Sequence, residues 1–284
     1  MNAQKKQLHP LKRLVIFLKR NGRMILGGGL VTLIIFGSIF APYLTDYDPQ
    51  FGDFSQVSQT PNAEHIMGCD VYGRDIFTRI LYGSRTTLIV VIGAQIITTV
   101  LGTALGLICG YYKWAEKILM RILDAFSTIP NLLLCLMMIA IFGAGELNLM
   151  LAMSVAGIPG LARTVRNQVL SLKEKEFIES EKAMGASDLR TLVVHMIPAF
   201  SSYLIVRFSN TLSSSILRIT SLSFLGLGIS PMIPNWGSMV SEAQNNIFKT
   251  PHMVLYPSLA ICLAVFGFSM LGDAVRDKLD PRLK

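Results

Sequence analysis

Six long apolar segments constrain this chain more strongly than any other feature of its sequence. The first, Met24 to Leu44, has no charged side chain, and about 20 helical residues cross the roughly 30 Å hydrocarbon core of a bilayer. The others are residues 86–112, 118–142 (broken by Pro130), 147–161 (short, and interrupted by Gly157, Pro159 and Gly160), 199–227 and 253–271. Backbone polar groups within a bilayer must be bonded internally. The sequence therefore predicts an all-α membrane protein with six transmembrane helices.

The composition agrees with this class of protein. Only 15% of the residues are charged and 51% are hydrophobic, whereas about 25% of the residues of a soluble domain are charged. The net charge is +8, and a basic balance can indicate nucleic-acid binding. Here the basic residues lie between the apolar segments, where anionic inner-leaflet lipid and membrane topology account for them. We therefore expect contact with membrane lipid and no nucleic-acid partner.

The basic residues are distributed unequally between the two sides that six spans would create. Of the 26 Lys and Arg residues, 20 lie in residues 1–23, 113–121, 163–190 and 276–284, and four lie in the alternate segments. The remaining two, Arg207 and Arg218, lie inside the fifth apolar segment. Short loops that are rich in Lys and Arg stay in the cytoplasm. The sequence therefore predicts that both termini are cytoplasmic.

The N-terminal segment, residues 1–23, alternates basic and apolar side chains. This pattern predicts an amphipathic helix, starting after Pro10, that lies on the cytoplasmic face of the membrane. The apolar run behind it is too long for a signal peptide, and no clear small-x-small cleavage site closes it. We therefore expect this basic segment to precede one six-span domain, residues 24–284. That domain would include an external segment, residues 45–85, and a cytoplasmic loop, residues 166–198.

The cytoplasmic loop has the pattern of a helix–glycine–helix hairpin. Phe177, Ile178 and Met184 recur at helical spacing and give a first short helix one apolar edge. Gly185 ends that helix in a tight turn that a Cβ would crowd, and Ser187 is placed to cap a second helix. Two interpretations stay open. The hairpin docks into a partner protein through its apolar side chains, or it lies on the lipid headgroups as an ordinary loop.

The fifth apolar segment is the most polar of the six. Arg207 and Arg218 lie eleven residues apart, close to three whole turns, so they share a face about 16 Å apart along the axis. An arginine at mid-bilayer costs about 2.5–3.5 kcal/mol on insertion scales. It should therefore face water or a partner. Two interpretations stay open. In the first, which we favour, the stripe lines a translocation pathway. In the second, it packs against another helix, with one arginine paired to Asp124 of the third segment.

No pattern of residues indicates catalysis. The chain has no GxxxxGK[ST] loop for nucleotide phosphates, and its four cysteines form no CxxC pair and have no clear histidine partner at metal-ligand spacing. Asp124 is the main candidate acid within an apolar segment, and it has no evident catalytic partner. The class of function that competes with a transport subunit is a membrane enzyme or a stand-alone channel. A secondary transporter would need repeats with broken helices and a midplane ion site.

Four motifs in order resemble the permease subunits of binding-protein-dependent ABC importers, in the peptide/nickel branch. They are Glu179 with Gly185-Ala186-Ser187-Asp188-Leu189-Arg190 and His195-x-x-Pro198, the outer stretch from His65 to Asp75, Ser223 to Gly228 with Trp236-Gly237, and the tail from Leu271 to Leu283. The resemblance covers about residue 60 to the end. The chain departs from the family at Ser180-Glu181, where Ala-Ala is usual, at Ile66 for Pro, at Cys69 for Thr and at Val275 for Leu.

The resemblance implies a type I importer permease in the bacterial inner membrane, moving dipeptides or oligopeptides, or alternatively nickel or metal chelates. It implies a second permease subunit, two ATPase subunits that hold ATP and Mg, and an extracytoplasmic substrate-binding protein, with no cofactor or metal in this chain. The outer motif, His65 to Asp75, is either a structural clip, which holds the connection between the first two spans in place, or a contact with the binding protein. The hairpin would be the coupling helix, with candidate residues Phe177, Ile178, Glu179, Met184, Gly185, Ala186, Leu189 and Pro198. The candidate pathway residues are Arg207, Asn210, Thr211, Ser214 and Arg218.

Overall fold

The computed structural model describes residues 10–279, with side chains from residue 21 onward apart from that of Lys182. Within that range the chain is mostly helical and forms no strand, only an isolated bridge between Cys69 and Asp75. The long helices are α1 (Pro10–Leu44), α2 (Ile76–Tyr111), α6 (Glu146–Lys173), α9 (Ile197–Phe224) and α11 (His252–Leu279). The short α-helices are α3 (Lys113–Ala115), α4 (Arg121–Thr128), α5 (Asn131–Phe142), α7 (Glu176–Ala183), α8 (Asp188–Arg190) and α10 (Trp236–Ala243). Two π-helical segments (Glu116–Met120 and Thr191–Met196) and two 3₁₀ turns (Phe54–Gln56 and Gln244–Asn246) complete the chain.

The expected all-α membrane fold is confirmed. Among the described residues, five helices are long and apolar enough to cross a membrane, and a bent pair raises the number to six. That pair is Lys113–Thr128 with Asn131–Phe142, and the two parts meet at 93°. The bend falls at the predicted Pro130, where Ile129 and Pro130 have extended ψ angles of 127° and 133°. A proline disfavours the helical conformation of the residue before it, so the chain turns there.

The predicted interruption of the fourth span is wrong. The structure has one continuous helix, α6, of 28 residues, and Pro159 lies inside it. Gly157 serves a close contact with α2, because a Cβ at this position would lie 2.9 Å from the Thr98 side chain. Small residues let transmembrane helices approach closely, so the glycine cluster marked an interface and not a break.

A row of glycines on α2 completes that interface. Gly102, Gly106 and Gly110 are spaced four apart, so they lie along one face of the helix. A Cβ at these positions would lie 2.9 Å from Leu161, 2.6 Å from Val165 and 2.6 Å from Val169 of α6, respectively. The two helices therefore pack at backbone distance, as small-xxx-small motifs permit.

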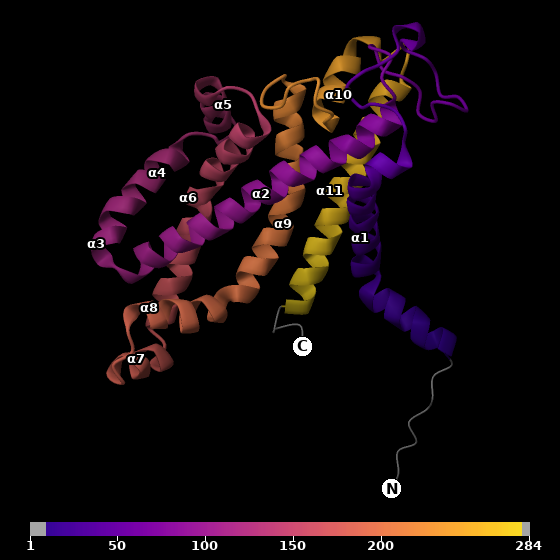
Figure 1. Ribbon diagram of the computed structural model, residues 1–284. Coiled ribbons are helices and arrows are strands. Elements are labelled where there is room, and N and C mark those ends of the chain that lie inside the picture. The colour runs from indigo at the N-terminus through magenta and orange to yellow at the C-terminus, as the bar shows by residue number, and fades with distance from the viewer. Residues whose placement is uncertain (1–9, 280–284) are drawn as a thin grey trace.

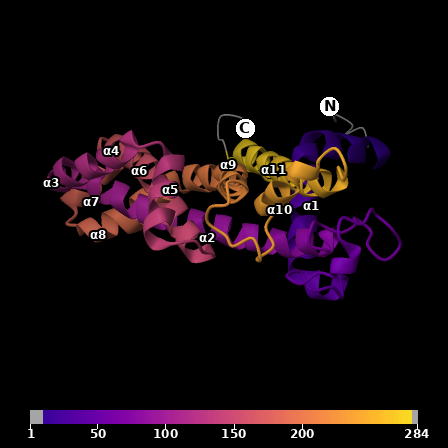
Figure 2. The same ribbon diagram turned by 90° about the horizontal axis from the view of Figure 1, so that it is seen from above.

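The long helices form two groups that α2 connects (Figures 1 and 2). In both views α2 extends from the group of α1 and α11 to the group of α3, α4 and α6. In Figure 1 the hairpin of α7 and α8 lies at the lower end, toward which α1 begins and α11 ends. A contact of 3.7 Å between Arg23 and Asp277 brings these parts of α1 and α11 together. Residues 45–75 and α10 lie at the opposite end.

Two sequence motifs extend beyond the described residues. The predicted basic N-terminal segment is helical from Pro10 as part of α1, and residues 1–9 and the side chains up to Arg20 lie outside the described part. The tail motif is helical to Leu279, and residues 280–284 lie outside the described part. The interfacial position of the basic segment therefore stays a prediction.

Candidate coupling hairpin, translocation cavity and external clip

The hairpin consists of α7, a turn at Gly185, and α8. Gly185 has a φ of +82°, and no atom lies within 4 Å of where its Cβ would be. The turn therefore requires glycine for its left-handed backbone, and the expected crowding of a Cβ is wrong. Ser187 is the first cap residue of α8, as predicted, but its side chain makes no capping hydrogen bond. The helix then runs without a break from Asp188 to Phe224, so the predicted second hairpin helix is the start of the fifth span.

The four apolar side chains predicted as docking anchors divide into two kinds. Phe177, Met184 and Leu189 are 46%, 79% and 72% exposed. Ile178 is only 1% exposed, and it belongs to an internal cluster with Leu107, Val169, Leu192, Met196 and others. Ile178 therefore holds α7 against α2 and α6 and is not available as a docking anchor. The exposed trio and the neighbouring Glu179, also exposed, remain the candidate docking surface.

Polar contacts fix the hairpin to the transmembrane helices. The Asp188 carboxylate accepts hydrogen bonds from the Tyr111 hydroxyl at 2.6 Å and the Tyr112 hydroxyl at 3.1 Å. The Lys173 ammonium donates to the Tyr111 carbonyl at 2.9 Å. The end of α2 is therefore tied to both sides of the hairpin. Sequence reasoning missed this contact, although Asp188 belongs to a recognised motif and the two tyrosines end the second apolar segment.

A further polar contact lies across the hairpin itself. Glu181 Oε1 is 2.6 Å from His195 Nδ1, and both side chains are partly buried. Glu181 is one of the two residues that replace the usual Ala-Ala of the family. In this chain the carboxylate therefore makes a contact that an alanine would lack. Pro198 lies at the start of α9, directly after the π-helical turn that carries His195, and Ala186 donates its backbone N–H to the Glu181 carbonyl at 3.1 Å.

A cavity of about 310 Å³ lies between α2, α6, the break between α4 and α5, and α9. Three of the five predicted pathway residues, Arg207, Thr211 and Arg218, line it. Asn210 instead lies against α11, where a Cβ at Gly272 would clash with its Oδ1. Ser214 donates its hydroxyl to the Thr211 carbonyl at 2.9 Å and does not line the cavity. The polar stripe is therefore divided between a cavity and a helix interface.

The packing alternative for Arg207 and Arg218 required Asp124 as the partner of one arginine. The Asp124 carboxylate lies 2.5 Å from Arg163 of α6, and neither Arg207 nor Arg218 pairs with it. Arg207 has the Tyr203 hydroxyl at 3.3 Å. Among the described residues, no carboxylate lies within ion-pair distance of either arginine. The Asp124 pairing that the packing alternative named is therefore not made, and the favoured pathway role stays a prediction.

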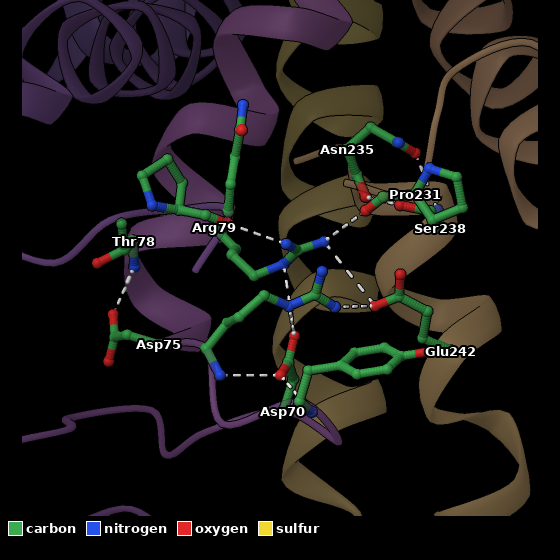
Figure 3. A network of polar contacts seen from close by, with 12 residues as sticks. Asp70, Asp75, Thr78, Arg79, Pro231, Asn235, Ser238 and Glu242 are labelled. Carbon is green, nitrogen blue, oxygen red and sulfur yellow. Dashed lines mark hydrogen bonds and ion pairs between the residues drawn. The ribbon is translucent and has the colours of Figure 1, made fainter. Parts of the chain in front are cut away.

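A network of buried charges (Figure 3) connects residues 70–79 with α10, at the end of the molecule opposite the hairpin (Figure 1). Arg74 contacts Asp70 at 2.6 Å and Glu242 of α10 at 2.5 Å. Arg79, fully buried, lies 3.6 Å from Asp70 and 3.8 Å from Glu242, and it donates to the Pro49 carbonyl at 2.9 Å. Burial raises the pKa of Glu242 more than the two arginines lower it. The network therefore joins the external segment to α10 by contacts that remove several charges from water.

Further contacts bind the outer motif to the helices. Asp75 caps α2 by accepting the Thr78 N–H at 2.7 Å, and it also lies 2.9 Å from His65 Nδ1. Trp236, 1% exposed, donates its indole N–H to the Ile80 carbonyl at 3.1 Å. These motif residues make the internal contacts that the clip alternative requires. Nothing in the described residues groups three or more His, Cys, Asp or Glu in a geometry that could hold a metal ion.

Comparisons with known proteins identify the class. Residues 102–284 match the family of binding-protein-dependent transport system inner membrane components. The chain is 42% identical to a glutathione transport system permease protein of Pectobacterium atrosepticum over 262 residues, covering 92% of this chain and 87% of the relative. It is 40% identical over 256 residues to proteins of the same name in Escherichia coli and Shigella boydii, covering 89% of this chain and 84% of each relative.

The family match covers the hairpin, α9 and α10, and the matches to the relatives cover about nine tenths of the chain. They also agree with the helical architecture and with the four motifs that suggested the family. The chain is a multi-pass inner-membrane transport subunit, and it belongs to the family of permeases of binding-protein-dependent ABC importers, in the peptide/nickel class.

Proposed function

We propose that this chain is one of two permease subunits of an ATP-driven importer of short peptides, with glutathione as the first candidate substrate. The observation that carries the proposal is the 42% and 40% identity, over about nine tenths of the chain, to proteins named as glutathione transport permeases. Glutathione is a tripeptide, so this substrate falls within the peptide class that the motifs imply.

The chain itself makes and breaks no bond in this proposal. Its sequence has no phosphate-binding loop, so two partner ATPases hold ATP and Mg. A second permease completes the membrane pathway, and an extracytoplasmic binding protein delivers the peptide. Exposed Phe177, Met184 and Leu189 support the hairpin as the place where an ATPase binds, because helix-in-groove contacts use a few apolar anchors.

The internal contacts suggest how movement passes from the ATPases to the cavity. A displacement of α7 acts on α2 and α6 through the Ile178 cluster. It acts on α2 through Asp188 and Tyr111, and on α9 through the unbroken helix that follows Asp188. These three helices line the cavity. Closure of the ATPase pair would therefore shift the equilibrium between inward-open and outward-open arrangements of the same spans.

The proposed orientation places the hairpin and both termini in the cytoplasm. It is supported by the unequal distribution of Lys and Arg along the sequence, and by the location of the hairpin, the start of α1 and the end of α11 at one end of the molecule. The external segment, residues 45–85, and α10 then face the binding protein.

Uptake by the complete complex in proteoliposomes tests the function. The two permeases, two ATPases and binding protein would be reconstituted with ATP inside the vesicles, and uptake of labelled glutathione, a dipeptide and a nickel chelate compared. The proposal expects peptide uptake that requires both ATP and the binding protein. Uptake of the nickel chelate alone would overturn peptide import and favour the metal-chelate alternative, while uptake without ATP would overturn the importer mechanism.

A further inference from the structure

The cavity between α2, α6 and α9 carries an excess of positive charge. Three arginines line it, Arg163, Arg207 and Arg218. The nearby Asp124 carboxylate contacts Arg163 at 2.5 Å, which leaves two guanidinium groups without a carboxylate partner in the described part of the chain. Arginine stays protonated in proteins, so both charges persist at any physiological pH.

Most hydrogen-bond donors of these two arginines are not used. Each guanidinium has five N–H donors. Arg207 uses one of them, toward the Tyr203 hydroxyl at 3.3 Å, and Arg218 has no hydrogen-bond acceptor among the described residues. Both side chains are only partly exposed. A partly buried cation with unused donors has a strong preference for an anionic acceptor, and arginine binds carboxylates with two parallel hydrogen bonds.

We propose that Arg207 and Arg218 bind the carboxylate groups of the transported peptide, and that the cavity thereby selects peptides that carry more than one carboxylate. This inference rests on the proposed function of peptide import. It adds to that function a binding site and a substrate class: short peptides with an acidic or γ-glutamyl residue besides the C-terminal carboxylate. A dipeptide of neutral residues offers only one carboxylate to the two arginines.

The shape and lining of the cavity fit such a ligand. Its volume of about 310 Å³ is at the lower end of the range for small-molecule sites. The amide side chains of Gln95 and Asn131 also line it, along with Ser127, and these groups can bond to a peptide backbone. Gly160, which has no side chain, leaves space next to Arg207, whose Nη2 is 3.8 Å from where a Cβ of Gly160 would lie.

The test compares transport of glutathione with that of its glycine amide, which lacks the C-terminal carboxylate, in the reconstituted complex. Each permease variant is measured with the same saturating binding protein, so the selectivity of that protein cancels from the comparison between variants. The variants are Arg218→Gln, Arg207→Gln and the charge-retaining Arg218→Lys. The matched control is Arg85→Gln, which removes one exposed arginine of α2 that lies outside the cavity.

We expect one of Arg218→Gln and Arg207→Gln, the variant that removes the partner of the C-terminal carboxylate, to lower the ratio of glutathione to amide transport by about tenfold through loss of a charge-assisted hydrogen bond. The other variant removes the partner of the γ-glutamyl carboxylate, which both peptides carry, and should lower the uptake of both. Arg85→Gln should leave the ratio unchanged, and Arg218→Lys should retain most of it. Glutathione uptake alone provides a second measurement if the amide is not transported: Arg218→Gln should lower it about tenfold and Arg218→Lys much less, with the complex fully assembled.

Equal losses for both peptides in both Arg218→Gln and Arg207→Gln, or loss of assembly in Arg218→Gln, would overturn the inference. Loss of assembly would indicate that a carboxylate of the partner permease neutralises these arginines. Neither result would affect the proposed function, which fails only if the wild-type complex transports no peptide.

Discussion

Arg74 and Glu242, 168 positions apart in the sequence, form a buried ion pair in which Nη2 and Oε2 are 2.5 Å apart. The pair fastens the external segment to α10. Because burial raises the pKa of Glu242 despite two neighbouring arginines, the removal of these charges from water offsets much of their attraction. We infer that the pair determines where the external segment lies more than it adds to net stability.

Removal of one partner of this pair should therefore be costly. Glu242→Ala leaves the buried Arg74 and Arg79 with Asp70 as their one remaining carboxylate partner, which should lower the free energy of unfolding by about 3–5 kcal/mol. A double change, Arg74→Met with Glu242→Leu, should cost clearly less than Glu242→Ala. Thermal unfolding of the purified protein in detergent measures both. Glu64→Gln, at an exposed position of the same segment, is the control. If Glu242→Ala and this control change thermal unfolding equally, the buried ion pair does not hold the external segment on α10.

Topology is tested by cysteine labelling from outside. Ala63→Cys, exposed in the external segment, should react with a membrane-impermeant maleimide in intact cells, and Lys175→Cys, exposed in the hairpin, should react only after the membrane is opened. Cys262 is exposed and must first be replaced. If both introduced cysteines are labelled in intact cells, the proposed topology is wrong.

One native cysteine can stay in that experiment. Cys69 is buried, and burial, together with Asp75 and Asp70, raises its pKa to about 11. The thiolate is the reactive form, and at pH 7 about one such thiol in ten thousand is ionised. We expect no labelling of Cys69 in the folded protein at pH 7, with reactivity rising only as the pH approaches 11. Rapid labelling at pH 7 would show that the external segment is open.

Adjacent residues of α7 should respond in opposite ways. Ile178→Ala removes a buried side chain from the cluster under the hairpin and should lower stability by about 2–5 kcal/mol. Phe177→Ala removes a side chain that is 46% exposed, so it should leave stability nearly unchanged but weaken ATPase binding. The melting temperature and the amount of ATPase that co-purifies separate the two. A stable Ile178→Ala protein that loses ATPase would return Ile178 to the docking surface.

These two residues also show what the sequence could predict. Helical spacing correctly placed Phe177 and Ile178 on one short helix, but spacing alone does not reveal which of them faces Val169 and Leu107 of other helices. The same limit explains Asp124. The sequence offered Asp124 only as a partner for Arg207 or Arg218, in the packing alternative, and its partner is Arg163 because α4 packs against α6.

Breaks in the apolar pattern were harder to interpret than the pattern itself. Pro130 was correctly predicted to break the third span, because both residues at the break are extended. Pro159 was wrongly given the same meaning, although α6 continues through it. In a membrane the neighbouring helices can satisfy the backbone groups that a proline frees. The external network was missed because Glu242 lies 168 positions from Arg74, past the end of the recognised Trp236-Gly237 motif.

Gly185→Val is the sharpest test of whether the hairpin couples ATP hydrolysis to transport. The φ of +82° at Gly185 is strained for valine, so the variant should distort the turn while the spans still insert. Gly143→Val is a matched control, because Gly143 has a φ of +86° and the same open space around it but lies between α5 and α6.

The measurement is substrate-stimulated ATP hydrolysis by the reconstituted complex, together with the ATPase retained on purification. The account predicts that Gly185→Val, and likewise Phe177→Asp on the exposed face of α7, lose stimulation and transport while Gly143→Val keeps its bound ATPase. Normal stimulation and normal transport in both Gly185→Val and Phe177→Asp would show that the hairpin is only a loop.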